Sequence, residues 1–153
     1  MTKRVLICSL VLAALASAVY AADLAVIVNP QNPVKSMTLA ELTKILKGKS
    51  PSWPTGHNIT IVLRDGDSPM LKLVAEKIMG VGADDARRAL SDPSRKATAP
   101  VVFATTDEDI VKFVGSNSSA IGFVDVYNIT GAVKVIKIDD KQPFDPGYVL
   151  KAH

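Results

Sequence analysis

The apolar residues of this chain follow two spacings, one typical of buried strands and one typical of amphipathic helices. Short apolar runs rich in β-branched residues indicate strands at 23–28, 58–63, 101–103 and 120–124. Apolar residues three and four positions apart indicate helices at 39–47, 69–79, 83–90 and from 107 to about 115. Strands that alternate with helices predict an α/β fold, with helices packed on a sheet.

Capping residues support the boundaries of two of these helices. Thr38 and Glu41 have the spacing of a capping box, and Gly48 follows the last apolar position of the first helix. Ser68 is suited to the N-cap of the second helix and Pro69 to its first position. We therefore expect the first helix to end near residue 47 and the second to begin at residue 69.

Prolines and glycines mark the segments between these elements. Residues 50–56 contain two prolines and one glycine, so a loop is expected there, with Trp53 folded back onto the core. Residues 94–100 are expected to form an exposed linking loop, and residues 145–147 a turn. Residues 132–138 alternate between apolar and polar and predict one further strand.

The N-terminus has the three parts of an export signal. Lys3 and Arg4 precede an apolar run at 5–18, and small residues follow it. The run is shorter than the roughly 20 apolar residues that span a bilayer. We expect a signal peptide at 1–21 that is cleaved after Ala21, with Ala18 as the alternative site. The mature domain, residues 22–153, is then periplasmic or secreted.

Removal of this segment changes the charge and the cysteine content. The full chain has 18 basic and 15 acidic residues, and loss of Lys3 and Arg4 leaves 16 basic against the same 15 acidic. A nearly neutral domain gives no electrostatic reason to expect nucleic acid as a partner. The one cysteine, Cys8, also leaves, so the mature fold depends on its hydrophobic core rather than on disulfides.

The residues offer little for catalysis. The two histidines are His57, in a predicted loop, and His153, the last residue. The sequence shows no pattern for a catalytic triad, a paired-carboxylate site, a metal or a cofactor, so we expect a binding protein rather than an enzyme. The acidic pairs at 84–85 and 139–140 are expected on the solvated surface.

The segment from Arg64 to Ser68 is the candidate binding site. It joins a predicted strand to a helix N-terminus, where backbone N–H groups lack partners and favour an anion. Arg64 would add a fork of donors suited to phosphate, sulfate or carboxylate, and Ser68 a hydroxyl. In the other interpretation Ser68 only caps its helix, and Arg64 pairs with Asp65 or Asp67. The sequence leaves both interpretations open.

Several short motifs occur in a recognisable order along the mature chain. They are Asn29-Pro30, Leu39-Ala40-Glu41-Leu42, Gly48-Lys49, Arg64 followed by Ser68, Ala120-Ile121-Gly122-Phe123-Val124, and Asp145-Pro146-Gly147-Tyr148. This order resembles the phosphate-binding proteins of periplasmic ABC importers, and more closely their short single-lobe relatives. The resemblance covers nearly all of the mature chain.

The resemblance implies a single lobe of the type II periplasmic-binding-protein fold, a mixed sheet flanked by helices. In that family the residues at the positions of Arg64 and Ser68 contact phosphate, and glycine and threonine follow where this chain has Pro69 and Met70. It also implies phosphate or another small oxyanion as ligand and an ABC transporter or a membrane sensor as partner. A homo-oligomer is left open.

A second hypothesis belongs to a different class of function. The lobe would serve as a scaffold for protein interaction, without binding phosphate. Trp53 or Phe123 would then lie at the rim of the former ligand cleft and contact the partner.

Overall fold

The computed structural model describes residues 23–66, 68–97 and 99–152. Its main sheet has five strands in the order β4-β3-β5-β1-β6. These are β1 Leu24–Val28, β3 Thr60–Arg64, β4 Val101–Ala104, β5 Ala120–Asp125 and β6 Lys134–Val135. Strand β3 runs parallel to β4 and β5, whereas β1 runs antiparallel to β5 and β6. The predicted mixed sheet is therefore confirmed.

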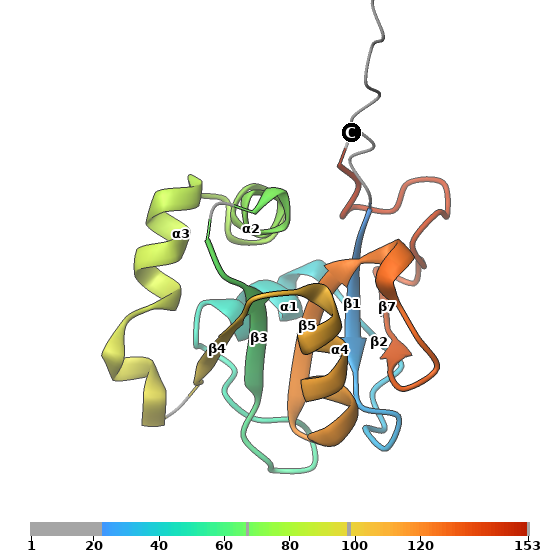
Figure 1. Ribbon diagram of the computed structural model, residues 1–153, viewed down its shortest axis with the longest axis horizontal. Helices are drawn as coiled ribbons and strands as arrows, with labels where there is room; N and C mark the ends of the chain where they lie inside the picture. The colour runs from blue at the N-terminus through green and yellow to red at the C-terminus, as the bar shows by residue number, and fades with distance from the viewer. Residues whose placement is uncertain (1–22, 67, 98, 153) are drawn as a thin grey trace, which may run out of the picture.

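Helices cover both faces of this sheet (Figure 1). Helix α4 packs on one face, mainly against β5 and β3, and α2 contacts the same two strands from the other face. The α-helices are α1 Leu39–Leu46, α2 Pro69–Leu73, α3 Ala83–Leu90 and α4 Asp107–Ser116. The helix predicted at 69–79 continues beyond α2 as a π-helical segment, η1, Val74–Met79.

Each face of the sheet has its own hydrophobic cluster, because successive strand residues point to opposite sides. Leu24, Val26 and Val28 of β1 belong to the cluster that includes α1, α2 and η1. Ala25 and Ile27 of the same strand belong to the cluster with α4. All five are fully buried, which explains why this strand reads as a continuous apolar run rather than an alternating one.

The predicted helix caps are present. The Thr38 hydroxyl accepts from the Glu41 N–H at 3.1 Å, and the Thr38 N–H donates to the Glu41 carboxylate at 2.7 Å, which completes the capping box. Asp139, predicted on the surface, is exposed and has an additional role: its carboxylate accepts from the Leu39 N–H at 3.0 Å. Residues 100 positions apart therefore meet at the start of α1.

The prediction of one strand at 132–138 is wrong. The segment forms two short strands in different sheets: β6 pairs with β1, and β7, Lys137–Ile138, pairs in parallel with β2, Ser36–Met37. The change of partner occurs at the buried Ile136, whose N–H donates to Val26 at 3.0 Å, while the next N–H donates to Lys35. Strand β2 was not predicted, because a two-residue strand gives too short a pattern.

The linking segment before β4 is also more ordered than expected. It contains a 3-10 helix, η2, Pro93–Ala97, instead of only a loop. The Asp92 carboxylate starts this turn by accepting from the Ser94 N–H at 2.9 Å. Ala99 is buried, so the segment also contributes to the core.

The two aromatic residues proposed for a protein-binding rim are both buried. Trp53 is 5% exposed and its indole N–H donates to the Ser119 carbonyl at 2.9 Å, which confirms that it folds back onto the core. Phe123 is 1% exposed and lies in the core cluster of the sheet. The placement of these side chains at an open rim is therefore wrong, and the interaction hypothesis loses the residues on which it depended.

The predicted signal peptide at 1–21, including Cys8, lies outside the described residues. Within the part of the chain that the structure describes, no helix combines the length and the apolar character needed to cross a membrane.

The contact between β5 and α4 gives a test of the packing. A methyl group on Gly122 would lie 2.8 Å from Ile110 and 2.9 Å from Val114, closer than side chains can approach. We expect Gly122→Ala to lower the free energy of unfolding by about 1–3 kcal/mol in urea denaturation, because overpacking forces the helix away from the sheet. Gly131→Ala is the matched control, since nothing lies within 4 Å of its added methyl. Equal stability of the two variants would contradict this packing.

Candidate functional site

Three parallel strands end at the same edge of the sheet. Strand β3 ends at Arg64, β4 at Ala104 and β5 at Asp125. Helix α2 follows β3 and helix α4 follows β4, so both helices begin at this edge. The carboxyl ends of parallel strands are where α/β folds usually place ligands. The fold therefore puts Arg64 in a favourable position for binding.

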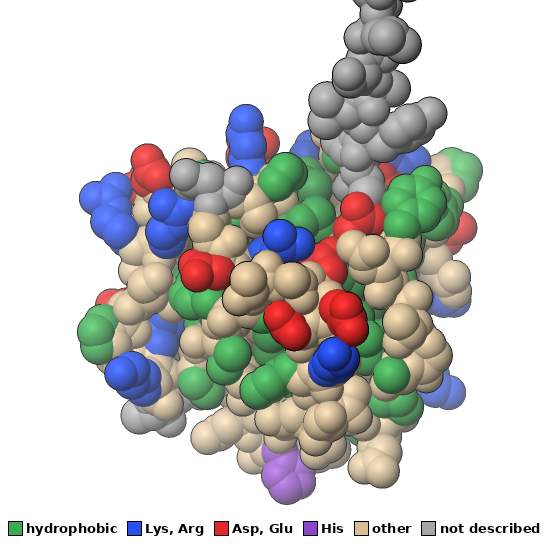
Figure 2. Space-filling model, in the orientation of Figure 1, with side chains coloured by type: hydrophobic (Ala, Val, Ile, Leu, Met, Phe, Trp, Pro, Cys, Tyr) green, Lys and Arg blue, Asp and Glu red, His purple; other side chains and the backbone are tan. Residues whose placement is uncertain are grey.

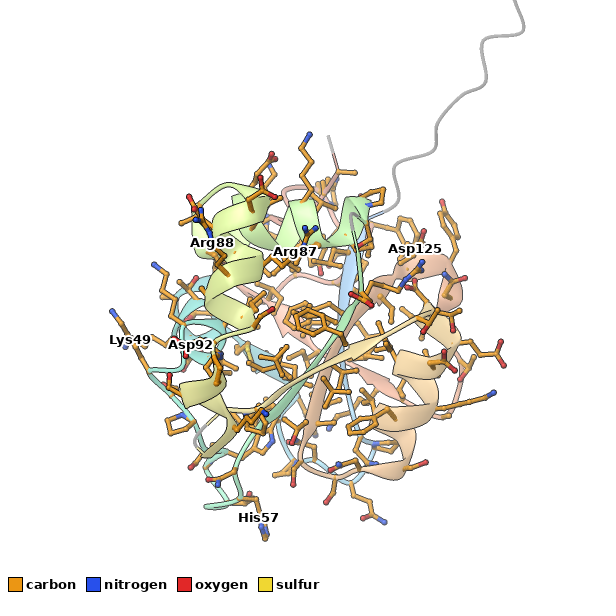
Figure 3. The ribbon with its side chains drawn as sticks, turned by 60° about the vertical axis from the view of Figure 1, so that its left-hand side comes forward. Lys49, His57, Arg87, Arg88, Asp92 and Asp125 are labelled. Carbon is orange, nitrogen blue, oxygen red and sulfur yellow. The ribbon has the colours of Figure 1, made fainter. Side chains whose placement is uncertain are left out.

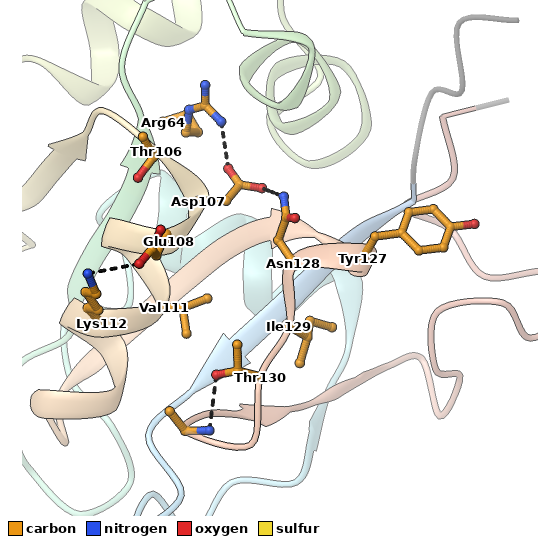
Figure 4. Close-up of a pocket in the computed structure, with 11 residues that line it drawn as sticks. Arg64, Thr106, Asp107, Glu108, Val111, Lys112, Tyr127, Asn128, Ile129 and Thr130 are labelled. Carbon is orange, nitrogen blue, oxygen red and sulfur yellow. Dashed lines mark hydrogen bonds and ion pairs between the residues drawn. The ribbon is translucent and has the colours of Figure 1, made fainter.

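A buried carboxylate holds Arg64 in place (Figure 4). The Arg64 Nη1 donates to Oδ1 of Asp107 at 3.0 Å, and Asp107 is only 5% exposed. The second oxygen of Asp107 accepts from the backbone N–H of Asp125 at 3.0 Å and from the Asn128 side-chain amide at 2.9 Å. Three donors thus compensate for burial of this carboxylate.

The remaining donors of Arg64 are not all used. Its Nε is shielded from solvent and has no hydrogen-bond partner, while the side chain as a whole is 34% exposed. Guanidinium is a planar fork, so one side can hold a carboxylate while another donates to a second acceptor. Arg64 is therefore both anchored and incompletely satisfied.

Ser68 caps the helix that follows. Its hydroxyl oxygen accepts from the Leu71 N–H at 3.1 Å, as the structural interpretation of this residue predicted. This contact uses the oxygen as acceptor and leaves the O–H as a donor. Ser68 and Arg64 lie at opposite ends of the loop from β3 to α2.

The loop between them is ordered by its own contacts. Asp65, one of the two partners considered for Arg64, accepts instead from the Gly66 N–H at 2.7 Å. Gly66 has a φ of 75°, which favours glycine. Nη2 of Arg87, from α3, donates to the Gly66 carbonyl at 3.3 Å. The other considered partner, Asp67, lies outside the described residues.

A cavity of about 640 Å³ opens beside Arg64, between α4 and the segment after β5. Asp107, Glu108 and Asn128 line it together with Arg64, whereas Ser68 is not among its lining residues. The structure thus places the two predicted site residues at one edge of the sheet, but only Arg64 faces this cavity.

The charges around the cavity are mixed. Glu108 lies in the first turn of α4 and pairs with Lys112 at 3.0 Å, and this hydrogen bond raises the pKa of Lys112. Figure 2 shows acidic and basic side chains next to each other over α4. Since the carboxylates near the cavity have basic partners at Lys112 and Arg64, the entrance is not dominated by negative charge.

Sequence reasoning missed Asp107 and Asn128. Asp107 is the first residue of α4, where an acidic residue is common because it complements the helix dipole. The available signal was its position shortly after a strand that ends at the same edge as Arg64. Asn128 lies in a short 3-10 turn, η3, Val126–Asn128, which had no recognisable pattern.

The residues considered for other chemistry do not line the cavity beside Arg64. His57 is exposed and lies at the opposite end of the molecule from Arg87 (Figure 3). Asp84 and Asp85 have 91% and 63% exposed side chains and pair with Arg87 and Arg88 of the same helix, which confirms the surface prediction. Across residues 23–66, 68–97 and 99–152, no three His, Cys, Asp or Glu side chains form a group that could hold a metal.

Comparisons with known proteins agree with this architecture. Residues 11–146 match the family model of a PBP superfamily domain, whereas no curated protein matches the chain. An ABC-type phosphate transport receptor from Vibrio cholerae aligns with a TM-score of 0.62 and 27% identity over 80% of this chain and 48% of its own. A phosphate-binding protein from Stenotrophomonas maltophilia aligns with a TM-score of 0.65 and 18% identity over 80% of this chain and 40% of its own.

The chain thus spans about half the length of these solved structures, or less. The single-lobe fold expected from the sequence is confirmed. It corresponds to one α/β lobe with a mixed sheet and helices on both faces.

The contacts of Asp107 generate a test. In Asp107→Asn one oxygen becomes an NH2 group, which faces donors and leaves at least one of them unsatisfied. We expect a loss of roughly 1–3 kcal/mol in the free energy of unfolding, measured by urea denaturation. Glu108→Gln is the neighbouring control: its side chain is 77% exposed, so a change within about 0.5 kcal/mol is expected. If both variants are as stable as the wild type, Asp107 does not hold this edge together.

Proposed function

The chain belongs to the family of PBP superfamily domains, and we propose a function from this membership. We propose that it is an exported solute-binding protein for phosphate or a similar small oxyanion. Support for the ligand class comes from the matched structures, which include a phosphate transport receptor and a phosphate-binding protein. Support for a role in binding rather than catalysis comes from the same relatives. Arg64 and Ser68 are the proposed ligand contacts.

The observation that carries this proposal is the state of Arg64. Asp107 occupies Nη1, and Nε remains a buried donor without an acceptor. A donor in this condition is costly, and an oxyanion oxygen that reached it after a small turn of the side chain would remove that cost. The ligand would therefore gain a hydrogen bond that the free protein cannot make for itself.

Ser68 would contribute its O–H, because its oxygen already accepts from Leu71. The next residue, Pro69, has no backbone N–H, and Met70 has no hydroxyl. The site therefore offers fewer donors than the related loop with glycine and threonine. We expect weaker binding than in two-lobed receptors, which also enclose the ligand more completely.

The ion pair between Arg64 and Asp107 would also affect which anions bind. Because Asp107 neutralises much of the charge of Arg64, the attraction for an anion depends on hydrogen-bond geometry more than on net charge. A tetrahedral oxyanion can accept from Arg64 and Ser68 with different oxygens. Phosphate and sulfate both have this shape, so sulfate is the natural competitor.

In the cell we propose residues 1–21 as a signal peptide and residues 22–153 as the exported binding domain. An ABC-type transporter or a membrane sensor is the proposed partner, since the matched receptor is described as a transport receptor. The exported protein would present its ligand to that partner outside the cytoplasm.

Isothermal titration of the exported protein with phosphate tests the ligand. We expect saturable heat for the wild type and at least tenfold weaker binding for Arg64→Lys, which keeps the charge but loses the fork; tenfold corresponds to about 1.4 kcal/mol. Arg88→Lys is the control, because Arg88 pairs on the exposed side of α3. No saturable heat at millimolar phosphate, with the wild type folded by circular dichroism, would reject phosphate.

Intact-mass spectrometry of the exported protein tests the signal peptide. We expect a mass that begins at Ala22, as cleavage after Ala21 requires. A mass that begins at Val19 would move the cleavage to Ala18. A mass that retains residues 1–21 would show that the segment is not a cleaved signal.

A further inference from the structure

Strand β4 forms an outer edge of the main sheet and pairs with β3. At its two ends, the Ile61 N–H donates to the Pro100 carbonyl at 2.9 Å, and the Asp65 N–H donates to the Ala104 carbonyl at 2.8 Å. Within a parallel ladder, every second residue of a strand bonds to the same neighbour. The carbonyls of Pro100 and Ala104 therefore face β3. The backbone groups of Val102, midway between them, face β3 as well.

The two intervening residues face the other way. The N–H and C=O groups of Val101 and Phe103 point outward from the edge of β4, where the sheet ends. Figure 3 brings this edge of the sheet to the front. Such an edge is a ready template for one more strand.

A groove of about 270 Å³ follows this edge and is lined by both apolar and basic residues. Leu90, Val101 and Phe103 supply the apolar part, and Arg95 and Lys96 of η2 supply the basic part. Val101 and Phe103 are half-buried and pack against the core beneath them. The groove thus combines outward-facing backbone groups, an apolar floor and positive charge.

Arg95 is incompletely satisfied in a way that resembles Arg64. Its Nε donates to the Ala99 carbonyl at 3.4 Å, but Nη2 is shielded from solvent and has no hydrogen-bond partner. The guanidinium lies next to Gly48. Burial lowers the pKa of Arg95, and the nearby charge of Asp92 offsets part of this effect. An acceptor is therefore missing at this position.

Asp92, the acidic residue that lines the groove, does not supply that acceptor. Asp92 is exposed, and its carboxylate accepts from the Ser94 N–H at 2.9 Å. The ion pairs seen among the described residues do not include one between Asp92 and Arg95. With Arg95 and Lys96 against one acid, the groove carries a net positive charge.

We propose that this groove binds an extended acidic segment of another protein, which adds to β4 as a further strand. The backbone of the segment would pair with Val101 and Phe103. Its alternate side chains would lie on the face of the groove, where a carboxylate reaches Arg95. A second copy of this chain fits less well, since pairing through β4 would bring a second Arg95 and Lys96 to the same edge. The proposal does not depend on ligand binding at Arg64.

The test starts from a phage-displayed library of random linear peptides, selected on the exported protein. We expect selected peptides that place aspartate or glutamate at alternate positions among β-branched residues. One such peptide is then measured by fluorescence polarisation, beside a version in which amides replace its carboxylates. At least tenfold weaker binding is expected for the amide version.

Two variants locate the binding. Arg95→Gln removes the charge, and Val101→Pro removes an outward N–H that makes no bond within the sheet. Each variant should weaken binding of the acidic peptide at least tenfold. Arg88→Gln, on the exposed side of α3, should leave the affinity unchanged. Thermal melting confirms that each variant is folded.

Several outcomes would overturn the proposal. These are a selection that yields no binding peptides, selected peptides without acidic residues, and equal binding to the wild type and to Arg95→Gln. A wild-type dimer that Val101→Pro converts to a monomer would assign the edge to a second copy instead. Complete competition by acetate, with no effect of Val101→Pro, would leave only a small-carboxylate site.

Discussion

The carboxylate of Asp107 joins two segments that are distant from it in the sequence, the end of β3 and the end of β5 with the turn that follows. It accepts from Arg64 at the end of β3, from the backbone at Asp125 where β5 ends, and from Asn128 in the turn that follows. Because it is also the first residue of α4, it ties that helix to the same edge of the sheet. A buried carboxylate needs such donors, and in meeting this need it fixes the position of the arginine that we assign to ligand binding.

The single lobe gives this site a different character from that of an enclosed receptor. The chain corresponds to about half of the structures it matches, and the cavity beside Arg64 is formed by α4 and the segment after β5. Ser68 does not line this cavity, so an anion that contacts both Arg64 and Ser68 would lie at the loop between β3 and α2. There it would stay partly in contact with water, and each well-placed donor would contribute modestly. The binding that we propose would then depend on donors without a partner in the protein, such as the Arg64 Nε.

Local signals in the sequence were sufficient for most of the fold. The capping box at Thr38 and Glu41 and the apolar run of β1 each depend on neighbouring residues, and both appear as predicted. What the sequence did not reveal depends on contacts across the chain. The predicted strand at 132–138 is interrupted at Ile136 because the chain changes its pairing partner there from β1 to β2. Asp107 has its role because two parallel strands end beside it. Neither contact leaves a pattern in adjacent residues.

The most direct test of this account follows the Nε–Hε resonance of Arg64 by proton–nitrogen NMR during a phosphate titration, with Arg64→Lys to assign the signal. We expect a saturable shift as Nε–H gains an acceptor, while the backbone amide of Asp125, bonded to Asp107, changes little. If calorimetry detects phosphate binding but the Arg64 resonance stays in place, the ligand binds elsewhere and Arg64 is not its contact.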